Sequence, residues 1–259
     1  MLQLLFDLGN TRIKWAICSR ADLGVDADMG EIQALDHADP VWQTQFAAAL
    51  ESLPTPASIA LAAVAPEMIV AAALRVLNAR WPELVLQRVH SLAQLGRFRS
   101  AYAQPERLGV DRFLAAAAAA QAPEARLVIG CGTALTIDLI DASGQHLGGL
   151  IAPAPETMRA AVLARTARVH WLREGTALDF GCTTEDGLEG GIWMAAAGMV
   201  ERAMRKASAR LGTMPALIAH GGSAQALADM LDVPLPIEPG LVFNGLRIWL
   251  DAQQAPLCG

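Results

Sequence analysis

The residues near the start of the chain with the clearest potential for chemistry lie in the segment LFDLGNTRIKW, residues 5–15. An apolar run ends on Asp7, crosses the triplet Gly9-Asn10-Thr11, and resumes as a second apolar run that carries Lys14. Glycine allows the backbone to approach a ligand closely, and the Asn and Thr side chains add donors to those of the backbone. Such a concave group of donors suits phosphate oxygens, and a lysine adds a point charge.

Asp7 is the unexpected member of this group, because a carboxylate by itself repels phosphate. It fits if a magnesium ion lies between the carboxylate and the phosphate. The same spacing also suits a plain β-hairpin whose turn contains Asn and Gly. The spacing alone leaves the phosphate site and the plain hairpin equally open.

A second glycine turn follows the apolar residues 126–129 and contains Gly132 and Thr133, and residues 135–140 then resume as an apolar run. Gly9 and Gly132 lie nearly half the chain apart, which indicates a duplicated domain. Two facing turns of this kind could bind one polyphosphate from both sides. Gly221-Gly222 forms a third glycine turn, which is weak evidence by itself.

A cluster of polar residues precedes the alanine-rich run at residues 113–122, and it includes Tyr102, Asp111 and Arg112. An aspartate at the start of a helix is often only a cap. It could instead act as a general base that takes a proton from a substrate hydroxyl. Arg112 could bind a substrate carboxylate through two parallel hydrogen bonds.

The composition is that of a globular protein of 259 residues, with 53% hydrophobic and 18% charged residues. The net charge of −6 and the lack of a Lys/Arg block argue against nucleic-acid binding. No apolar stretch approaches the length of a membrane span, and no secretory leader is evident. The four cysteines, Cys18, Cys131, Cys182 and Cys258, have no zinc spacing, so we expect free thiols in a cytoplasmic protein.

Hydrophobic patterning predicts alternating strands and helices. Strands are expected over residues 2–6, 13–18, 58–64, 84–89, 126–129, 135–140, 146–152 and 216–219. Helices are expected over residues 40–53, 66–81, 156–165, 185–211 and 239–251, and from the third glycine turn to about residue 231. Residues 113–122 would form the helix between the two halves. The P-loop, dinucleotide-binding and protein-kinase motifs are absent.

Taken together, these segments resemble the type III pantothenate kinases, also called the Bvg accessory factor family. The matching residues fall in order along most of the chain: residues 7–14, Tyr102, residues 109–112, residues 132–134, residues 148–151, residues 181–184 and Gly190. Each motif by itself is weak, whereas the ordered set is specific.

The resemblance implies an α/β fold of the actin/Hsp70/sugar-kinase type. This fold has two ribonuclease H-like domains, predicted here as residues 1–112 and 113–259, with mixed sheets, flanking helices and ATP in the cleft between the halves. It implies ATP-dependent phosphorylation of pantothenate to 4'-phosphopantothenate, the first step of coenzyme A biosynthesis. It also implies a cytoplasmic homodimer that uses Mg²⁺ and a monovalent cation, K⁺ or NH₄⁺.

The resemblance also assigns roles to residues. ATP binding is implied for Asp7, Leu8, Gly9, Asn10, Thr11, Arg12, Ile13, Lys14 and Thr133, with Asp7 on the magnesium side. Pantothenate binding is implied for Tyr102, Gly109, Val110, Asp111, Arg112 and Thr184, with Asp111 as the catalytic base. Thr184 matches a residue that reaches the pantothenate of the neighbouring subunit.

Two positions depart from the family pattern. Gly130 stands where the family usually has the aspartate that helps to hold the monovalent cation, so we expect a weakened or altered potassium dependence. Thr183 stands where the family has asparagine, which could change local hydrogen bonding. The alternatives are a kinase for another small hydroxy acid and an accessory or regulatory protein on the same fold, with or without catalysis.

Overall fold

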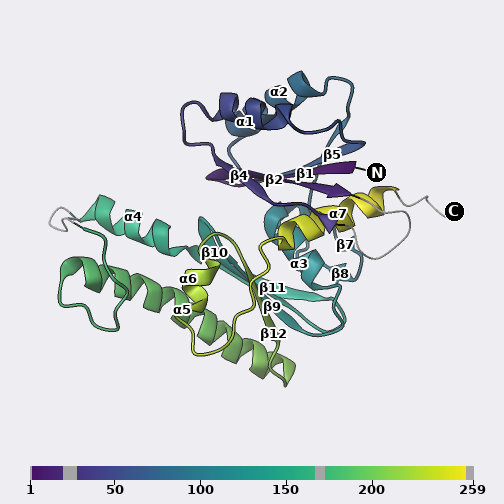
Figure 1. The fold of residues 1–259 in the computed structure, drawn as a ribbon. Coiled ribbons are helices and arrows are strands. Elements are labelled where there is room, and N and C mark those ends of the chain that lie inside the picture. Colours follow the sequence, from purple (N-terminus) through teal and green to yellow (C-terminus); the bar gives the residue numbers. More distant parts are fainter. Residues whose placement is uncertain (1, 20–27, 167–172, 255–259) are drawn as a thin grey trace. The chain divides into compact units, whose positions relative to one another are not determined.

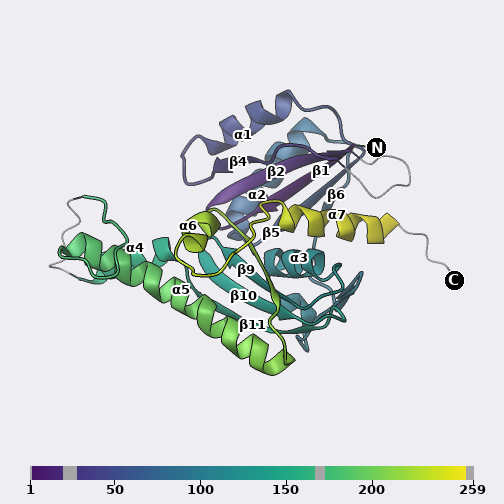
Figure 2. The same cartoon turned by 60° about the horizontal axis from the view of Figure 1, so that its bottom comes forward.

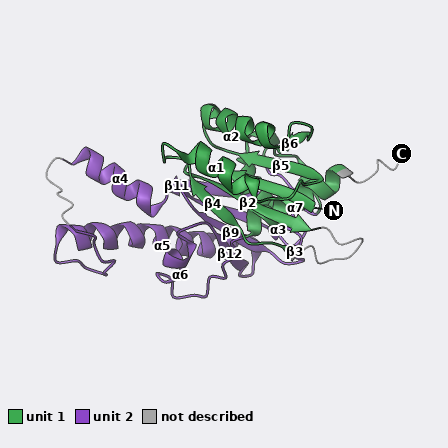
Figure 3. Ribbon diagram, turned by 45° about the horizontal axis from the view of Figure 1, so that its top comes forward, with its two compact units in different colours: residues 1–96, 102–118, 240–259 green, residues 97–101, 119–239 purple. Residues whose placement is uncertain are grey.

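The computed structural model describes residues 2–19, 28–166 and 173–254 (Figure 1). The chain forms two compact units (Figure 3). Unit 1 contains Met1–Gly96, Tyr102–Ala118 and Gly240–Gly259, and unit 2 contains Arg97–Ala101 and Ala119–Pro239. Each unit therefore takes up more than one stretch of sequence. The predicted domains, residues 1–112 and 113–259, stay a prediction.

The sheet of unit 1 is built on the β1–β2 hairpin. β1 (Leu2–Leu8) pairs antiparallel with β2 (Arg12–Ser19) and parallel with β5 (Ser58–Ala63). The short strands β3 (Asp28–Met29) and β4 (Gln33–Asp36) pair antiparallel with β2, and β6 (Leu86–Arg88) pairs parallel with β5. The hairpin thus lies in the middle of the sheet, where its backbone is fixed from both sides.

Helices cover both faces of this sheet. α1 (Trp42–Glu51) and α2 (Glu67–Arg80) pack on one face, where the apolar side chains of alternate β1 residues meet Phe46 and Leu50. α7 (Leu241–Gln254) contacts β1 and β5, although its sequence is remote from theirs. Unit 1 also contains β7 (Gln94–Leu95), the 3₁₀ helix Pro105–Arg107 and most of α3 (Val110–Ala119).

The sheet of unit 2 has the strand order β11-β10-β9-β12. β9 (Arg126–Cys131) and β10 (Ala134–Ile140) form its central hairpin. β11 (His146–Pro153) pairs antiparallel with β10, and β12 (Ala216–His220) pairs parallel with β9.

Helices α5 (Thr184–Leu211) and α6 (Ala224–Ala228) pack on this sheet, as Figure 2 shows. The unit also contains β8 (Phe98–Arg99) and α4 (Pro155–Arg165). The alanines and other apolar side chains on one side of α5 meet alternate residues of β9 and β10, so one face of the sheet is covered by the core.

The two units repeat one topology. Each has a central antiparallel hairpin, a further antiparallel strand beyond its second member, and a parallel strand beside its first member. This repetition confirms the duplicated α/β fold expected from the two glycine turns. A parallel partner requires a crossover connection, which explains why α1 and α5 precede β5 and β12 in the sequence.

The structure changes three sequence expectations. The strands expected over residues 2–6 and 13–18 extend to Leu8 and begin at Arg12, so the first turn is tighter than expected. The helix expected to reach residue 231 ends at Ala228. The strand expected over residues 84–89 is confined to Leu86–Arg88. Among the described residues, no helix is long and apolar enough to cross a membrane.

Two helical glycines give opposite predictions for stability. A Cβ on buried Gly245 of α7 would lie 2.2 Å from the carbonyl oxygen of Leu114 in α3, whereas a Cβ on exposed Gly198 of α5 would meet nothing within 4 Å. We expect Gly245→Ala to destabilise the fold by about 1–3 kcal/mol through overpacking. Gly198→Ala should stabilise it by about 0.5–1 kcal/mol, because alanine loses less backbone entropy in a helix. Denaturant unfolding measures both, and equal effects would contradict this packing.

Candidate functional site

The β1–β2 turn places a small group of exposed polar residues at the end of a rigid hairpin. The Gly9 N–H donates to the Arg12 carbonyl oxygen at 3.0 Å, which closes the turn. Asn10 and Thr11 then lie exposed at its tip, while Leu8 and Ile13 are buried on either side. The apolar pair anchors the hairpin in the core, and the polar tip lies at the surface.

His37, which the sequence analysis missed, holds this turn from β4. Its Nε2 lies 2.9 Å from the Gly9 carbonyl oxygen, and its backbone N–H donates to the Thr11 carbonyl oxygen at 3.1 Å. These two contacts fix the backbone carbonyl groups of the turn. His37 follows β4, a short strand that the sequence did not predict, so no sequence signal pointed to this contact.

Asp7 and Lys14 face each other across the hairpin as register partners, and both are half-buried. Burial raises the pKa of Asp7 from 3.8 to about 6, Lys14 opposes this rise, and the negative charge of Asp111 adds to it. Asp7 and Asp111 are therefore close enough to repel each other, although they lie far apart in the sequence. Such a pair is a suitable place for a divalent cation or for the proton of a substrate hydroxyl.

Asp111 lies in the first turn of α3, which begins at Val110. Its Oδ1 accepts the backbone N–H of Arg112 at 2.8 Å. A Cβ on Gly109 would lie 2.8 Å from the same oxygen, so glycine leaves room for the carboxylate there. The helix N-terminus stabilises the ionised form. Its position at the start of α3 and its proximity to Asp7 are compatible. Asp111 can therefore begin the helix and also act as a general base.

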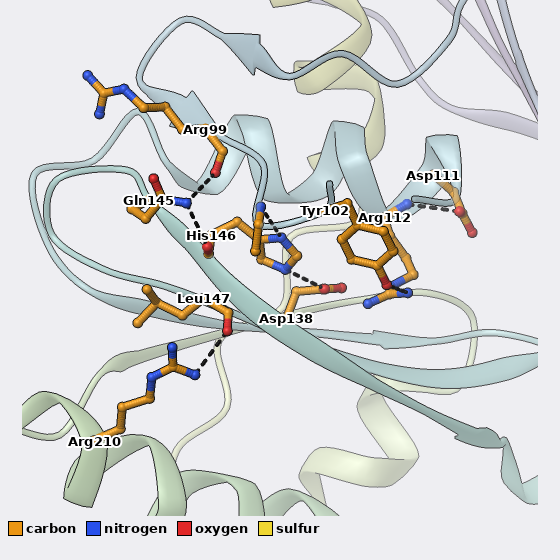
Figure 4. Close-up of polar contacts among 10 residues, drawn as sticks. Arg99, Tyr102, Asp111, Arg112, Asp138, Gln145, His146, Leu147 and Arg210 are labelled. Carbon is orange, nitrogen blue, oxygen red and sulfur yellow. Dashed lines mark hydrogen bonds and ion pairs between the residues drawn. The ribbon is translucent and has the colours of Figure 1, made fainter. Parts of the chain in front are cut away.

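Tyr102 and Arg112 form the second part of this cluster (Figure 4). The Arg112 guanidinium Nη1 lies 3.4 Å from the Tyr102 hydroxyl, and Arg112 is buried. A cavity of about 410 Å³ is lined by Tyr102, Ala103, Gln104 and Arg107. The structure therefore brings the predicted substrate residues Tyr102, Asp111 and Arg112 together within unit 1.

Ser91 fixes the loop that leads into α3, and the sequence analysis did not find it. Its buried hydroxyl donates to the Leu108 carbonyl oxygen at 2.7 Å. The following residues, Gly109 and Val110, carry the chain from that anchor into the first turn of the helix. The orientation of Asp111 thus depends on a residue from a different segment.

The second glycine turn, in unit 2, has a similar geometry. The Gly132 N–H donates to the Ala134 carbonyl oxygen at 3.1 Å, and both Gly132 and Thr133 are exposed. A Cβ added to Gly132 would meet nothing within 4 Å, so the space beside its backbone is open. Thr157 of α4 donates to the Thr133 carbonyl oxygen at 2.7 Å and anchors the turn.

Thr184 begins α5 in unit 2, and its neighbour Thr183 is the N-cap. The Thr183 hydroxyl oxygen accepts the Asp186 N–H at 3.2 Å, and the hydroxyl lies 2.8 Å from Asp186 Oδ2. Arg173 and the Thr176 N–H also bind the Asp186 carboxylate and hold its pKa well below its usual range. Threonine therefore serves as the cap where the family pattern has asparagine, and Thr184 remains exposed.

Metal binding would have to rely on few protein ligands. In the described ranges, no group of three or more His, Cys, Asp or Glu side chains could hold a metal ion. Magnesium does not require such a group, because it is usually held by one or two carboxylates together with substrate phosphates. Asp7 fits that pattern, since its desolvated carboxylate lies beside a turn rich in donors.

The type III pantothenate kinase family model matches residues 3–206. A type III pantothenate kinase from Stenotrophomonas maltophilia (strain R551-3) is 40% identical over 256 residues, which cover 98% of this chain and all of that protein. A solved Baf family transcriptional activator from Campylobacter jejuni has a TM-score of 0.60 at 21% identity, covering 96% and 98% of the two chains. A glucokinase from an Antarctic psychrotroph has a TM-score of 0.51 at 13% identity, covering 97% and 99%. These solved structures support the sugar-kinase type of fold.

The raised pKa of Asp7 predicts a pH-dependent cost to stability. Between pH 4 and 6 the folded state holds a proton that the unfolded state has lost, so stability falls as pH rises through this window. We expect Asp7→Asn to raise the free energy of unfolding by about 1–3 kcal/mol at pH 7.5, and by roughly half as much at pH 5.

Denaturant unfolding without nucleotide or magnesium would measure this difference. Glu51→Gln, at the exposed end of α1, is the matched control and should show no comparable gain. An Asp7→Asn protein less stable than the unchanged chain at pH 7.5 would mean that Lys14 outweighs the burial of the carboxylate.

Proposed function

Because this chain belongs to the type III pantothenate kinase family, we propose that it transfers the γ-phosphoryl group of ATP to the hydroxyl of pantothenate. The product is 4'-phosphopantothenate, and the reaction is the first step of coenzyme A biosynthesis. The observation that carries the proposal is the grouping of Asp7, Lys14 and Asp111 in unit 1, beside Tyr102 and Arg112. This grouping combines the parts for a phosphate donor with those for an acceptor that has a carboxylate and a hydroxyl.

The donor part of the proposal is the β1–β2 hairpin, residues 7–14. Its exposed tip offers backbone and side-chain donors to the ATP phosphates, and Lys14 adds a positive charge. Thr133 of unit 2 is proposed as a further ATP contact, which its exposed turn and the open space beside Gly132 support. Transfer then depends mainly on holding the reactants in line and neutralising charge.

The acceptor part is the segment from Tyr102 to Arg112. Arg112 is proposed to bind the pantothenate carboxylate, with Tyr102, Gly109 and Val110 completing the site. Asp111 is proposed to accept the proton of the attacking hydroxyl. Asp111 need not be a strong base if the transition state is loose, as most analyses of phosphoryl transfer find.

Magnesium with ATP is the proposed cofactor, and Asp7 would hold it together with the phosphates. When bound, the ion would neutralise charge on the phosphates. The chain's own contribution is to keep Asp7 ionised at neutral pH, since its pKa of about 6 is below 7 despite burial. Lys14 on the facing strand supports that ionised form.

A homodimer located in the cytoplasm is also part of the proposal. Thr184 would reach the pantothenate of the partner subunit, and its exposed position at the start of α5 is compatible with that role. Large apolar side chains are exposed in unit 2, including Phe180 (91%) and Ile151 (65%). A partner subunit that covered these side chains would remove their apolar surface from water.

The first test is ATP consumption by the purified chain with and without pantothenate. In the presence of magnesium, we expect pantothenate-dependent turnover on the order of 1–100 s⁻¹. The assay should be run with potassium, with ammonium and with neither, so that the result does not depend on the monovalent cation. No pantothenate-dependent turnover under any of these conditions would overturn the proposal and favour an accessory role or a different acceptor.

The base assignment has a separate test. Asp111→Asn should lower turnover by about 10²–10⁴-fold, because the amide cannot accept the hydroxyl proton. Its melting temperature should stay near that of the unchanged chain. Glu83→Gln, an exposed acid of unit 1, is the control and should keep full activity. Unchanged turnover in folded Asp111→Asn would show that this carboxylate is not the base.

A further inference from the structure

The cavity in unit 1 is lined by one charged residue that has no role in the proposed reaction. Among the described residues that line it, Tyr102, Ala103, Gln104 and Arg107, only Arg107 is charged. The volume of about 410 Å³ lies within the range of small-molecule sites, in which a few polar groups orient the ligand. A hydroxyl, an amide and a guanidinium therefore line a space that suits a small polar ligand with an anionic group.

The guanidinium of Arg107 is available to such a ligand. Its side chain is exposed, and it makes no hydrogen bond or ion pair with any residue that the structure describes. An arginine is always protonated in proteins and has five N–H donors. Arg112 differs, because it is buried and its Nη1 lies 3.4 Å from the Tyr102 hydroxyl (Figure 4). Arg112 thus has part of its guanidinium engaged inside unit 1, whereas Arg107 can present its whole planar group to a carboxylate.

The backbone that carries Arg107 is fixed at the edge of the cavity. Arg107 ends the 3₁₀ helix, and Pro105 restricts the backbone at its start. The Arg107 N–H donates to the Gln104 carbonyl oxygen at 3.0 Å. The next residue, Leu108, accepts the buried Ser91 hydroxyl at 2.7 Å. A turn that is ordered before the ligand arrives lowers the entropy cost of binding.

The charges of the proposed acceptor call for a cation at this position. Pantothenate carries its reactive hydroxyl at one end and its carboxylate at the other. Asp111, the proposed base, contributes a negative charge, which would repel a carboxylate close to it. The carboxylate end therefore needs surroundings with a positive charge and no acid. The described lining of the cavity meets both conditions, and Tyr102 connects it to Arg112.

We propose that Arg107 binds the carboxylate end of the acceptor in this cavity, in addition to the contact proposed for Arg112, and thereby favours acids over neutral analogues. The identity of the acceptor rests on the proposed function. The cavity, the charge beside it and the available guanidinium are features of this structure. Arg107 is thus a residue that determines specificity, and Asp111 keeps the role of base.

The test compares the binding of two acceptors and needs no turnover. Calorimetric titration of the purified chain gives the Kd for pantothenate and for panthenol, in which a neutral CH₂OH group replaces the carboxylate. Arg107→Gln should raise the Kd for pantothenate about 10-fold and change that for panthenol less than about 2-fold, because only the carboxylate loses a charge-assisted hydrogen bond. Arg75→Gln removes the same charge from an exposed position of α2, and this control should change neither Kd.

Each other outcome counts against the inference. An equal loss of affinity for both acceptors in Arg107→Gln would show that Arg107 only supports the local structure. An unchanged Kd for pantothenate would show that its carboxylate is bound elsewhere. If that variant also phosphorylates pantothenate with the KM of the unchanged chain, the inference fails and the proposed function stands. A chain that neither binds nor phosphorylates pantothenate would overturn both.

Discussion

The arrangement of unit 1 depends on placing one desolvated carboxylate, Asp7, at the end of a central strand. Burial works against its ionisation, and Asp111 adds a second negative charge nearby. Lys14 is the only opposing charge among the causes that shift its pKa, and it lies directly across the hairpin. The hairpin has paired strands on both sides and helices on both faces, and this packing fixes the positions of Asp7 and Lys14.

The residues proposed to bind the substrate are also held in place by packing and hydrogen bonds between separate segments. Asp111 and Arg112 are placed by the first turn of α3, and the loop before that turn is held by the Ser91 hydroxyl. A carboxylate at a helix N-terminus remains ionised readily, because the N–H groups there carry a partial positive charge. The two carboxylates therefore lie in different surroundings, Asp111 at a helix N-terminus and Asp7 in a buried position that raises its pKa.

Much of the fold was predictable because the apolar periodicity of the sequence matches the faces that the core covers. Trp42, Phe46 and Leu50 recur every four residues and are buried together in α1. The recurrence of the glycine turn predicted the duplicated topology, which the two sheets confirm. The short strands β3 and β4 were not predicted, since their few residues are ordered by pairing with β2 and not by their own pattern.

The sequence by itself determined the residue types and their order: two glycine turns, the carboxylates Asp7 and Asp111, and the Tyr102–Arg112 cluster. Tertiary structure alone decided which of these residues meet and what holds them. Asp7 lies within electrostatic reach of Asp111, His37 secures the first turn, Thr157 secures the second, and the side chains of Thr136 and His220 lie beside Gly130. These contacts join residues from separate segments. Register and close packing determine them, and neither leaves a local pattern in the sequence.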